Sequence, residues 1–387
     1  MKKKRFKRIL IANRGEIAIR IMRAATELGL RTVSMYSQED RYALHRYKAD
    51  ESYLVGLGKS PLGAYLGIED IVALALEKKC DAVHPGYGFL SENADFARAC
   101  HENGIVFVGP PADVMVQAAD KIAARKLADA AGVACVPGIS EAVDVAMARA
   151  FGERVGYPII LKATAGGGGR GIRICRTADE VEERLGEASR EAASAFGNGE
   201  VYVEKCVERP KHIEVQILGD MYGNVVHLFE RDCSVQRRHQ KVVEIAPATA
   251  LSEASRVAMT DAAVRIAKAA GYQNAGTVEF LYEPDSGEFY FIEVNARIQV
   301  EHTVTEAVTG IDLVKAQIRI AEGAPLSHPD IGIDSQASVE LRGVAIQCRI
   351  TTEDPANGFL PDYGRISTMR TAAGHGIRLD AGSAFSG

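Results

Sequence analysis

A run of six residues near the middle of the chain, Gly166-Gly167-Gly168-Gly169-Arg170-Gly171, limits the possible folds more than any other feature. Residues 158–163 before it and 172–175 after it both have the composition of short strands. The run fits Gly-x-Gly-x-x-Gly, but a dinucleotide-binding loop leads from a strand into a helix, and this one leads from strand to strand. No Gly-Lys-Ser/Thr follows, so it is not a Walker A loop. We interpret it as a flap whose backbone N–H groups bind phosphate, with a flexible linker as the alternative.

The first hundred residues alternate between short apolar strands and amphipathic helices. Strands are expected at residues 8–12, 32–36, 81–84 and 105–108, and helices at residues 16–28, 68–79 and 95–103. This alternation predicts a parallel sheet with right-handed crossovers. Ligands bind at the carboxyl ends of the strands in such sheets, and the loops at Asn13-Arg14-Gly15 and Tyr87-Gly88 fall at that edge.

The pattern changes near residue 137. Three strands (158–163, 172–175 and 201–206) and a helix (178–195) predict a small α+β lobe at about residues 137–206. Strands at 212–219, 225–231 and 242–244, a helix at 253–270 and a hairpin of residues 277–282 and 289–295 follow. We therefore expect an α/β and α+β protein with three parts. They are a Rossmann-like domain at residues 1–120, a linker and lid at 121–206, and a third part at 207–387.

Composition excludes several classes of protein. The 46 Lys and Arg against 51 Asp and Glu give a net charge of −5, which leaves no overall basic surface for nucleic acid. No apolar stretch approaches the roughly 18–20 residues of a membrane span, and the apolar run behind the basic N-terminus is too short for a signal peptide. The seven cysteines are far apart and form no Cys-x-x-Cys, which argues against disulfides and structural zinc and favours the cytoplasm.

Polar residues alternate along the second hairpin strand and beyond it. If residues 293–302 stay extended, one face carries Glu293, Asn295, Arg297, Gln299 and Glu301. Counting back from the hairpin turn places Glu279 nearly opposite Glu293. Two carboxylates about 4 Å apart repel by roughly 4 kcal/mol at an effective dielectric of 20, so this pair needs a cation. With an amide oxygen the pair would suit Mg²⁺ shared with phosphates, and a solvated strand face is the alternative.

Further polar residues indicate that the chain binds anions. Arg297 is suited to hold a carbonate-like anion in a bidentate fork, and Glu301 is suited to act as a base. Residues 231–241 form another polar cluster, in which His239 and Lys241 share a face if the segment is extended. Alone, this cluster is typical of a surface charge run or an RNA-contacting patch. Together with the flap and the acidic pair, it predicts an ATP-dependent enzyme that transfers a phosphoryl group.

These motifs resemble the biotin carboxylase component of biotin-dependent carboxylases, which are ATP-grasp enzymes. The resemblance rests on residues 9–18, 84–93, 166–171, 230–241 and 293–302, which together span nearly the whole chain. Residues 36–40, 45–51 and 241–248 resemble the N-terminal part of pyruvate carboxylases more than the acetyl-CoA carboxylase subunit. The resemblance implies ATP-, Mg²⁺- and bicarbonate-dependent carboxylation of biotin through carboxyphosphate. It also makes residues 207–387 the ATP-grasp core with an incomplete C-terminal domain.

The resemblance assigns a role to each matching residue. The nucleotide contacts that it implies are Lys121, Lys162, Gly167, Gly168, Gly169, Glu204, Lys205, His212 and Gln236. The ligands of Mg²⁺ or Mn²⁺ that it implies are Glu279, Glu293 and Asn295. The contacts to bicarbonate or carboxyphosphate that it implies are Arg297, Gln299, Val300, His239 and Lys241. It makes Glu301 the base, gives Arg349 the stabilisation of the biotin enolate, and places Tyr87 and Gly88 at the edge of the biotin pocket.

The resemblance also implies partners. Family members continue past Gly387, so we expect a C-terminally truncated chain whose biotin comes from a carrier domain on another chain or segment. A carboxyltransferase component and a homo-oligomer are also implied. Three alternatives remain open. Another ATP-grasp ligase would share the flap and the acidic pair but not the Arg297-x-Gln299-x-Glu301 pattern. A nicotinamide-dependent dehydrogenase conflicts with the strand-to-strand loop. The third is a fragment that binds ATP without turnover.

Overall fold

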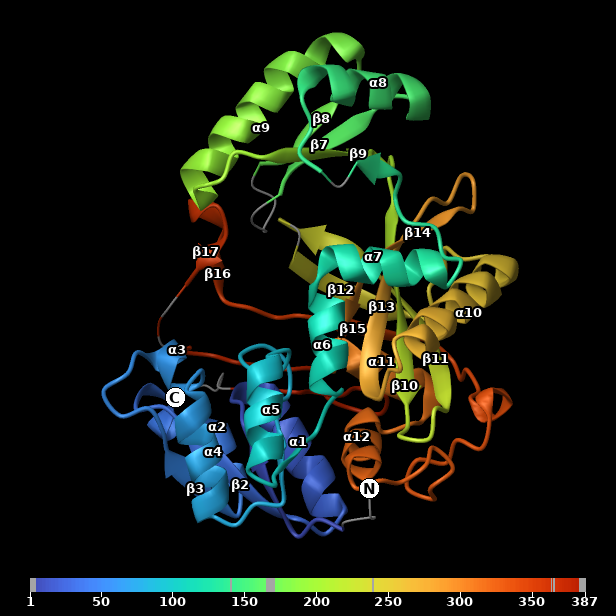
Figure 1. The fold of residues 1–387 in the computed structure, drawn as a ribbon. Coiled ribbons are helices and arrows are strands. Elements are labelled where there is room, and N and C mark those ends of the chain that lie inside the picture. The colour runs from blue at the N-terminus through green and yellow to red at the C-terminus, as the bar shows by residue number, and fades with distance from the viewer. Residues whose placement is uncertain are drawn as a thin grey trace.

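The computed structural model describes residues 5–139, 141–164, 171–238, 240–362, 364 and 366–382 (Figure 1). The described strands form one five-stranded, one six-stranded, one four-stranded and one two-stranded sheet. Figure 1 shows the four-stranded sheet and its two helices at one end of the molecule and the five-stranded sheet with its helices at the other. The six-stranded sheet lies between them, and its strands carry Lys241, Glu279 and Glu293.

The N-terminal part is a parallel sheet with the strand order β3-β2-β1-β4-β5. Its strands are β1 (Arg8–Ile11), β2 (Arg31–Tyr36), β3 (Glu51–Leu54), β4 (Ala82–His84) and β5 (Val106–Phe107). Its helices are α1 (Gly15–Glu27), η1 (Glu39–Tyr42), α2 (Leu44–Lys48), α3 (Pro61–Ala64), α4 (Ile68–Glu77) and α5 (Ala94–Glu102). Ile9 and Ile11 join one hydrophobic cluster while Leu10 joins another, so both faces of β1 are covered. The predicted elements are confirmed to within one or two residues, whereas β3, α2 and α3 were not predicted.

The lid is an antiparallel sheet with the strand order β6-β9-β7-β8. Helices α6 (Ala112–Ala119) and α7 (Lys121–Ala130) precede it in the chain. Its elements are β6 (Gly138–Ile139), α8 (Val145–Val155), β7 (Ile159–Ala163), β8 (Arg173–Cys175), η2 (Ala178–Glu180), α9 (Val181–Phe196) and β9 (Val201–Lys205). Phe151, Leu161 and Val203 belong to its separate hydrophobic core. Because β7 pairs with β8, the predicted strand-to-strand context of the glycine run is confirmed, while residues 165–170 lie outside the described residues.

The six-stranded sheet has the order β14-β13-β10-β11-β12-β15, and its neighbouring strands are antiparallel. Its strands are β10 (Lys211–Gly219), β11 (Val225–Arg237), β12 (Gln240–Ala246), β13 (Asn274–Tyr282), β14 (Phe289–Asn295) and β15 (Ala345–Cys348). The helices α10 (Glu253–Ala269), α11 (His302–Thr309) and α12 (Leu313–Ala321) pack against its strands. The rest comprises η3 (Gln336–Ser338), β16 (Glu353–Asp354), η4 (Pro355–Asn357) and β17 (Leu360–Pro361).

Residues 231–237 belong to β11, in which Arg231 is 0% exposed and Val235 is 52% exposed. The alternative of a surface charge run therefore holds only for part of the segment. The expectation of a continuously extended chain after the hairpin is wrong. The extended conformation assumed for residues 293–302 ends at Asn295, where β14 ends. The chain then turns, because the carbonyl of Gln299 accepts a hydrogen bond from the backbone N–H of His302 at 3.2 Å, and α11 begins there.

Two general features bear on the predicted setting of the protein. No helix in the described part of the chain is long and apolar enough to cross a lipid bilayer. All seven cysteines are free thiols, in agreement with their wide spacing in the sequence.

Candidate active site

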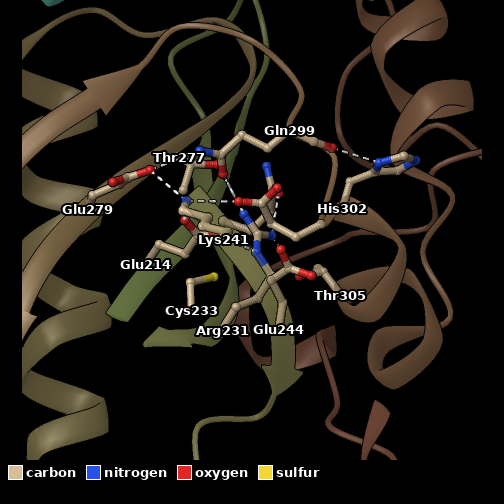
Figure 2. Close-up of polar contacts among 12 residues, drawn as sticks. Glu214, Arg231, Cys233, Lys241, Glu244, Thr277, Glu279, Gln299, His302 and Thr305 are labelled. Carbon is tan, nitrogen blue, oxygen red and sulfur yellow. Dashed lines mark hydrogen bonds and ion pairs between the residues drawn. The ribbon is translucent and has the colours of Figure 1, made fainter. Parts of the chain in front are cut away.

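A buried cluster of charged side chains lies at the centre of the six-stranded sheet (Figure 2). Lys241 on β12 donates hydrogen bonds to Glu214 on β10, to Glu279 on β13 at 2.9 Å and to Glu301 at 2.8 Å. The three carboxylate side chains are 0–6% exposed. Burial disfavours the charged ammonium, but the carboxylates outweigh this effect and raise the pKa of Lys241. Lys241 is therefore a fixed cation shared by three carboxylates from different parts of the chain.

Glu279 lies opposite Glu293 across β13 and β14, as the count from the hairpin turn predicts. Its Oε1 accepts hydrogen bonds from the side-chain amides of Asn295 and Gln299, each at 3.0 Å, and its Oε2 lies 2.7 Å from Nε2 of His212. Burial penalises the ionised carboxylate, but His212 and Lys241 outweigh it and lower the pKa of Glu279. Burial likewise opposes the charged imidazole, but Glu279 raises the pKa of His212. Glu279 is thus held as an anion.

The expected metal ligands lie next to one another. Asn295 donates its amide hydrogens to Glu279 at 3.0 Å and to Glu293 at 3.5 Å, so both carboxylates converge on one point. Its amide oxygen instead accepts from Arg297 at 3.0 Å. Two converging carboxylates are the oxygen donors that Mg²⁺ prefers, so Glu279 and Glu293 fit this ion. Glu214, His212 and Glu279 form a second group, whose ligand atoms lie within 4.8 Å of one another.

Glu301 is held between two cations at the first residue before α11. Its Oε1 accepts from Lys241, and its Oε2 accepts from Nη2 of Arg349 at 2.9 Å. Arg349 follows β15, which pairs with β12, and its Nε also donates to buried Glu244 on β12 at 2.6 Å. Burial raises the pKa of Glu244. The geometry places a buried carboxylate between two cations that can stabilise a small anion.

The turn before Glu301 carries the other residues expected at the bicarbonate site. Gln299 is 3% exposed and lies between Arg231 and Glu279. Val300 follows it in the turn and is half-buried. Arg297 is also half-buried, and its guanidinium donates to Glu92 at 2.9 Å as well as to Asn295. The structure therefore brings Glu301 to Lys241, and it brings Gln299 to Glu279, to which Lys241 also donates, whereas Arg297 contacts Glu92 and Asn295.

The expected nucleotide contacts are spread over the lid and the central sheet. Lys162 on β7 donates to Glu204 on β9 at 2.5 Å, and Arg125 on α7 donates to the same carboxylate at 3.0 Å. Lys205 instead reaches the carbonyl of Gly156 at 2.9 Å, so its side chain is not next to that of Glu204. Lys121 is exposed at the start of α7, and Gln236 on β11 bonds the carbonyl of Cys233 at 2.9 Å. Gly167, Gly168, Gly169 and His239 lie outside the described residues.

Tyr87 and Gly88 follow β4 and line a cavity of about 300 Å³. The loop after β1, including Asn13 and Arg14, forms another wall, so the cavity lies at the carboxyl edge of the parallel sheet, where the sequence places a ligand site. The hydroxyl of Tyr87 donates to Glu16, and burial raises the pKa of Tyr87.

Four residues of the site received no role from the sequence, although Arg231 belongs to the polar cluster at residues 231–241: Glu214, Arg231, Glu244 and Arg125. A signal existed for Glu214, because His212, Glu214 and Gln216 alternate along β10 and share one face. No comparable local pattern marks Glu244 or Arg125, since their partners come from distant segments.

Comparison with known proteins gives the same regions a family context. Residues 5–115 match the family model "Biotin carboxylase, N-terminal domain", and residues 120–329 match "Carbamoyl-phosphate synthase L chain, ATP binding domain". The chain is 58% identical to pyruvate carboxylase 1 of Caenorhabditis elegans and 55% identical to pyruvate carboxylase of Bacillus subtilis, over 100% of its own length. It covers 33% and 34% of those proteins, so it spans about a third of the length of the curated relatives it matches.

A solved structure resembles most of the chain. It is the biotin carboxylase domain dimer of 2-oxoglutarate carboxylase from Hydrogenobacter thermophilus, in complex with MgADP, ADP and bicarbonate. The sequence identity is 49% and the TM-score is 0.88, over 99% of this chain and 83% of that one.

Proposed function

The chain belongs to the biotin carboxylase family and is an ATP-dependent carboxylase domain with the ATP-grasp fold, and we propose that it performs the first half-reaction of a pyruvate carboxylase. In that reaction biotin is carboxylated at the expense of ATP, with bicarbonate as the carbon source. The observation that carries the proposal is the position of Glu301 between Lys241 and Arg349, beside Gln299. The proposed substrate, bicarbonate, is an anion that both cations would attract.

The proposed chemistry begins with a proton transfer from bicarbonate to Glu301. The resulting carbonate oxygen attacks the γ-phosphorus of ATP, which forms the C–O–P bond of carboxyphosphate and releases ADP. Carboxyphosphate then breaks its C–O bond to give CO₂ and phosphate. The phosphate removes the N1′ proton of biotin, and the enolate forms a bond to CO₂. Arg297 and Lys241 neutralise the bicarbonate and carboxyphosphate, and Arg349 stabilises the enolate.

The remaining site residues would bind the other ligands. On the nucleotide we place Lys121, Lys162, Gly167, Gly168, Gly169, Glu204, Lys205, His212 and Gln236. Glu279 and Glu293 would hold Mg²⁺ or Mn²⁺, with Asn295 beside them, and the ion would neutralise charge on the transferred phosphoryl group. Val300 and His239 would contact bicarbonate, and Tyr87 and Gly88 would border biotin.

The partners follow from the same proposal. Biotin would arrive on a carrier domain, and a carboxyltransferase component would consume carboxybiotin. We also propose a homo-oligomer, which the dimer described for the Hydrogenobacter domain supports, and a cytoplasmic location, which the seven free cysteines support. The whole activity with pyruvate as the final acceptor is supported by the names of the relatives.

ATP hydrolysis with Mg²⁺, measured with and without bicarbonate and free biotin, tests the proposed function. We expect hydrolysis that requires bicarbonate, rises with biotin and falls about 100-fold or more in Glu301→Gln, because that variant lacks the base. Hydrolysis that is indifferent to bicarbonate and biotin would point to another ATP-grasp ligase. Binding of ATP without any turnover would instead identify a fragment that holds the nucleotide but lacks the activity.

A further inference from the structure

Gln299 lies between a group that can only donate hydrogen bonds and a group that can only accept them. Its Oε1 accepts from Nη2 of Arg231 at 2.8 Å, and its Nε2 donates to Oε1 of Glu279 at 3.0 Å (Figure 2). A guanidinium has no acceptor and an ionised carboxylate has no donor. The side-chain amide of Gln299 therefore has one allowed orientation, in which the N–H side faces the carboxylates and the oxygen faces Arg231.

Several hydrogen bonds hold the side chain of Arg231 in place. It is 0% exposed, and its guanidinium also donates to Glu214 at 2.6 Å and to Gln216 at 2.7 Å. Two threonine hydroxyls complete its partners, at 2.9 Å on Thr305 and 3.2 Å on Thr277. All three nitrogens of the guanidinium are thus engaged, from strands β10 and β13 and from helix α11. A lysine in this place would keep the charge but could not reproduce this planar set of bonds.

His302 fixes the main chain of Gln299. Its Nδ1 lies 2.8 Å from the backbone carbonyl of Gln299, and its backbone N–H donates to the same oxygen at 3.2 Å. Because a carbonyl only accepts, Nδ1 carries the proton. His302 is 3% exposed, and Figure 2 shows its imidazole on the side of Gln299 away from Lys241. The turn that carries Gln299, Val300 and Glu301 is therefore fixed at both its main chain and a side chain.

We propose that Arg231 and His302 are positioning residues of the bicarbonate site, which act through Gln299 by fixing its amide N–H toward the substrate. This inference rests on the proposed function, since it assigns bicarbonate to that site. An anion accepts hydrogen bonds, so an amide locked with its N–H outward binds it, and an amide free to turn would offer its oxygen and repel it. The lock thus favours an oxyanion over a neutral ligand without either positioning residue touching it.

Steady-state ATP hydrolysis by this chain tests the lock. We expect Arg231→Lys to raise the KM for bicarbonate roughly tenfold or more, the size expected for one charge-assisted hydrogen bond, while the KM for ATP stays within about twofold. His302→Leu, which removes the Nδ1 donor, should act in the same direction. His302→Asn should restore most of the affinity for bicarbonate, because its amide nitrogen can donate to the carbonyl of Gln299 in place of Nδ1.

A double-mutant cycle separates positioning from general damage. In a Gln299→Ala background, Arg231→Lys should add little to the KM for bicarbonate, because the residue through which it acts is gone. Arg256→Lys is the matched control. Arg256 pairs at 2.9 Å with Glu230, a buried carboxylate on the same strand as Arg231, so this variant should lower the melting temperature and leave the KM for bicarbonate unchanged.

The outcomes distinguish this inference from the proposed function. If the unsubstituted chain shows bicarbonate-dependent hydrolysis and both Arg231→Lys and His302→Leu keep its KM for bicarbonate, the function stands and the lock is refuted. Equal losses for His302→Leu and His302→Asn, or additive effects of Arg231→Lys and Gln299→Ala, would also refute it. If Arg231→Lys does not fold, the KM values for bicarbonate of His302→Leu and His302→Asn still test the proposed lock. Absence of bicarbonate-dependent hydrolysis in the unsubstituted chain overturns the function and this inference together.

Discussion

Two glutamates in this molecule each bind two cations, and their surroundings differ. Glu301, directly before α11, binds Lys241 and Arg349. Its side chain is 3% exposed, and those of the two cations are 14% and 28% exposed. Glu204 in the lid binds Lys162 and Arg125. Its side chain is 10% exposed, and those of the two cations are 31% and 26% exposed. Buried charges must keep their partners, whereas partly exposed ones exchange them with water at little cost. The central cluster is therefore preorganised, and the lid pair is able to give up its glutamate for a phosphate group.

The largest expected effect is the removal of the shared cation in the centre. Lys241→Met leaves Glu214, Glu279 and Glu301 without their common partner, and we expect it to lower the free energy of unfolding by about 3 kcal/mol or more. Urea unfolding monitored by circular dichroism measures this change. The matched control is Lys315→Met, because Lys315 pairs with half-exposed Glu27 and should lose less than about 1 kcal/mol. Similar losses in both variants would show that the burial of the three carboxylates adds nothing to the stability that Lys241 provides.

Acid should also weaken the central sheet, through half-buried His227. Burial lowers the pKa of His227 on β11 to about 4, against about 6.5 in the unfolded chain. Between these values the unfolded state binds a proton that the folded state does not, so stability falls as the pH falls from about 6.5 to 4. His227→Gln should flatten this dependence by about 2 kcal/mol across that range.

Urea unfolding at several pH values between 4.5 and 7.5 provides the measurement. Unchanged slopes in the variant would show that His227 titrates alike in both states. The lid should not show this pH dependence, because residues 137–206 contain no histidine that could titrate in this range. Substitution of Lys162 should consequently leave the slope of stability against pH between 4.5 and 6.5 as it is in the unsubstituted chain.

The sequence predicted the parts of the site that one hairpin contains. Glu279 opposite Glu293 follows from counting residues away from the turn, and the structure has that register. Arg231 and Glu214 could not be found in this way, because they meet across β10 and β11, whose register shifts between Val215 and Ile217. A shift of this kind changes which side chains face each other, and residue spacing does not reveal it.

Long-range pairing and the end of a strand were equally hard to predict. Arg349 reaches Glu301 because β15 pairs with β12, about a hundred residues earlier in the chain, and no local pattern encodes that pairing. The polar alternation continues past Asn295, although β14 stops there. The competing helix α11 decides the outcome, since its first turn ties His302 back to Gln299. The strands and helices of the N-terminal sheet were predicted closely because both their periodicity and their stop signals are local.

Substitutions in the lid should change the affinity for ATP rather than the free energy of unfolding. Lys162→Met should raise the KM for ATP about tenfold, the loss expected for one charge-assisted hydrogen bond to phosphate, and change the free energy of unfolding by less than about 1 kcal/mol. Arg173→Met is the control, because Arg173 on β8 makes equally exposed ion pairs with Glu187 and Glu191 on α9. It should leave the KM for ATP unchanged. A loss of stability in Lys162→Met as large as that in Lys241→Met would contradict the comparison.

The smallest effect should come from Arg125, and it should depend on salt. Arg125→Met leaves Glu204 to Lys162 alone, so the lysine is held more firmly by the glutamate and is less available to a phosphate. We expect the KM for ATP to rise about two- to threefold at low ionic strength, because a partly exposed pair contributes under about 1 kcal/mol. Raising the salt to about 1 M shortens the Debye length to about 3 Å and should abolish this difference. The same salt should not rescue Lys241→Met, because its carboxylates are buried and weakly screened. A salt-independent effect at Arg125 would mean that the lid pair is as rigidly held as the central cluster, and the exchange of Glu204 for phosphate would have to be abandoned.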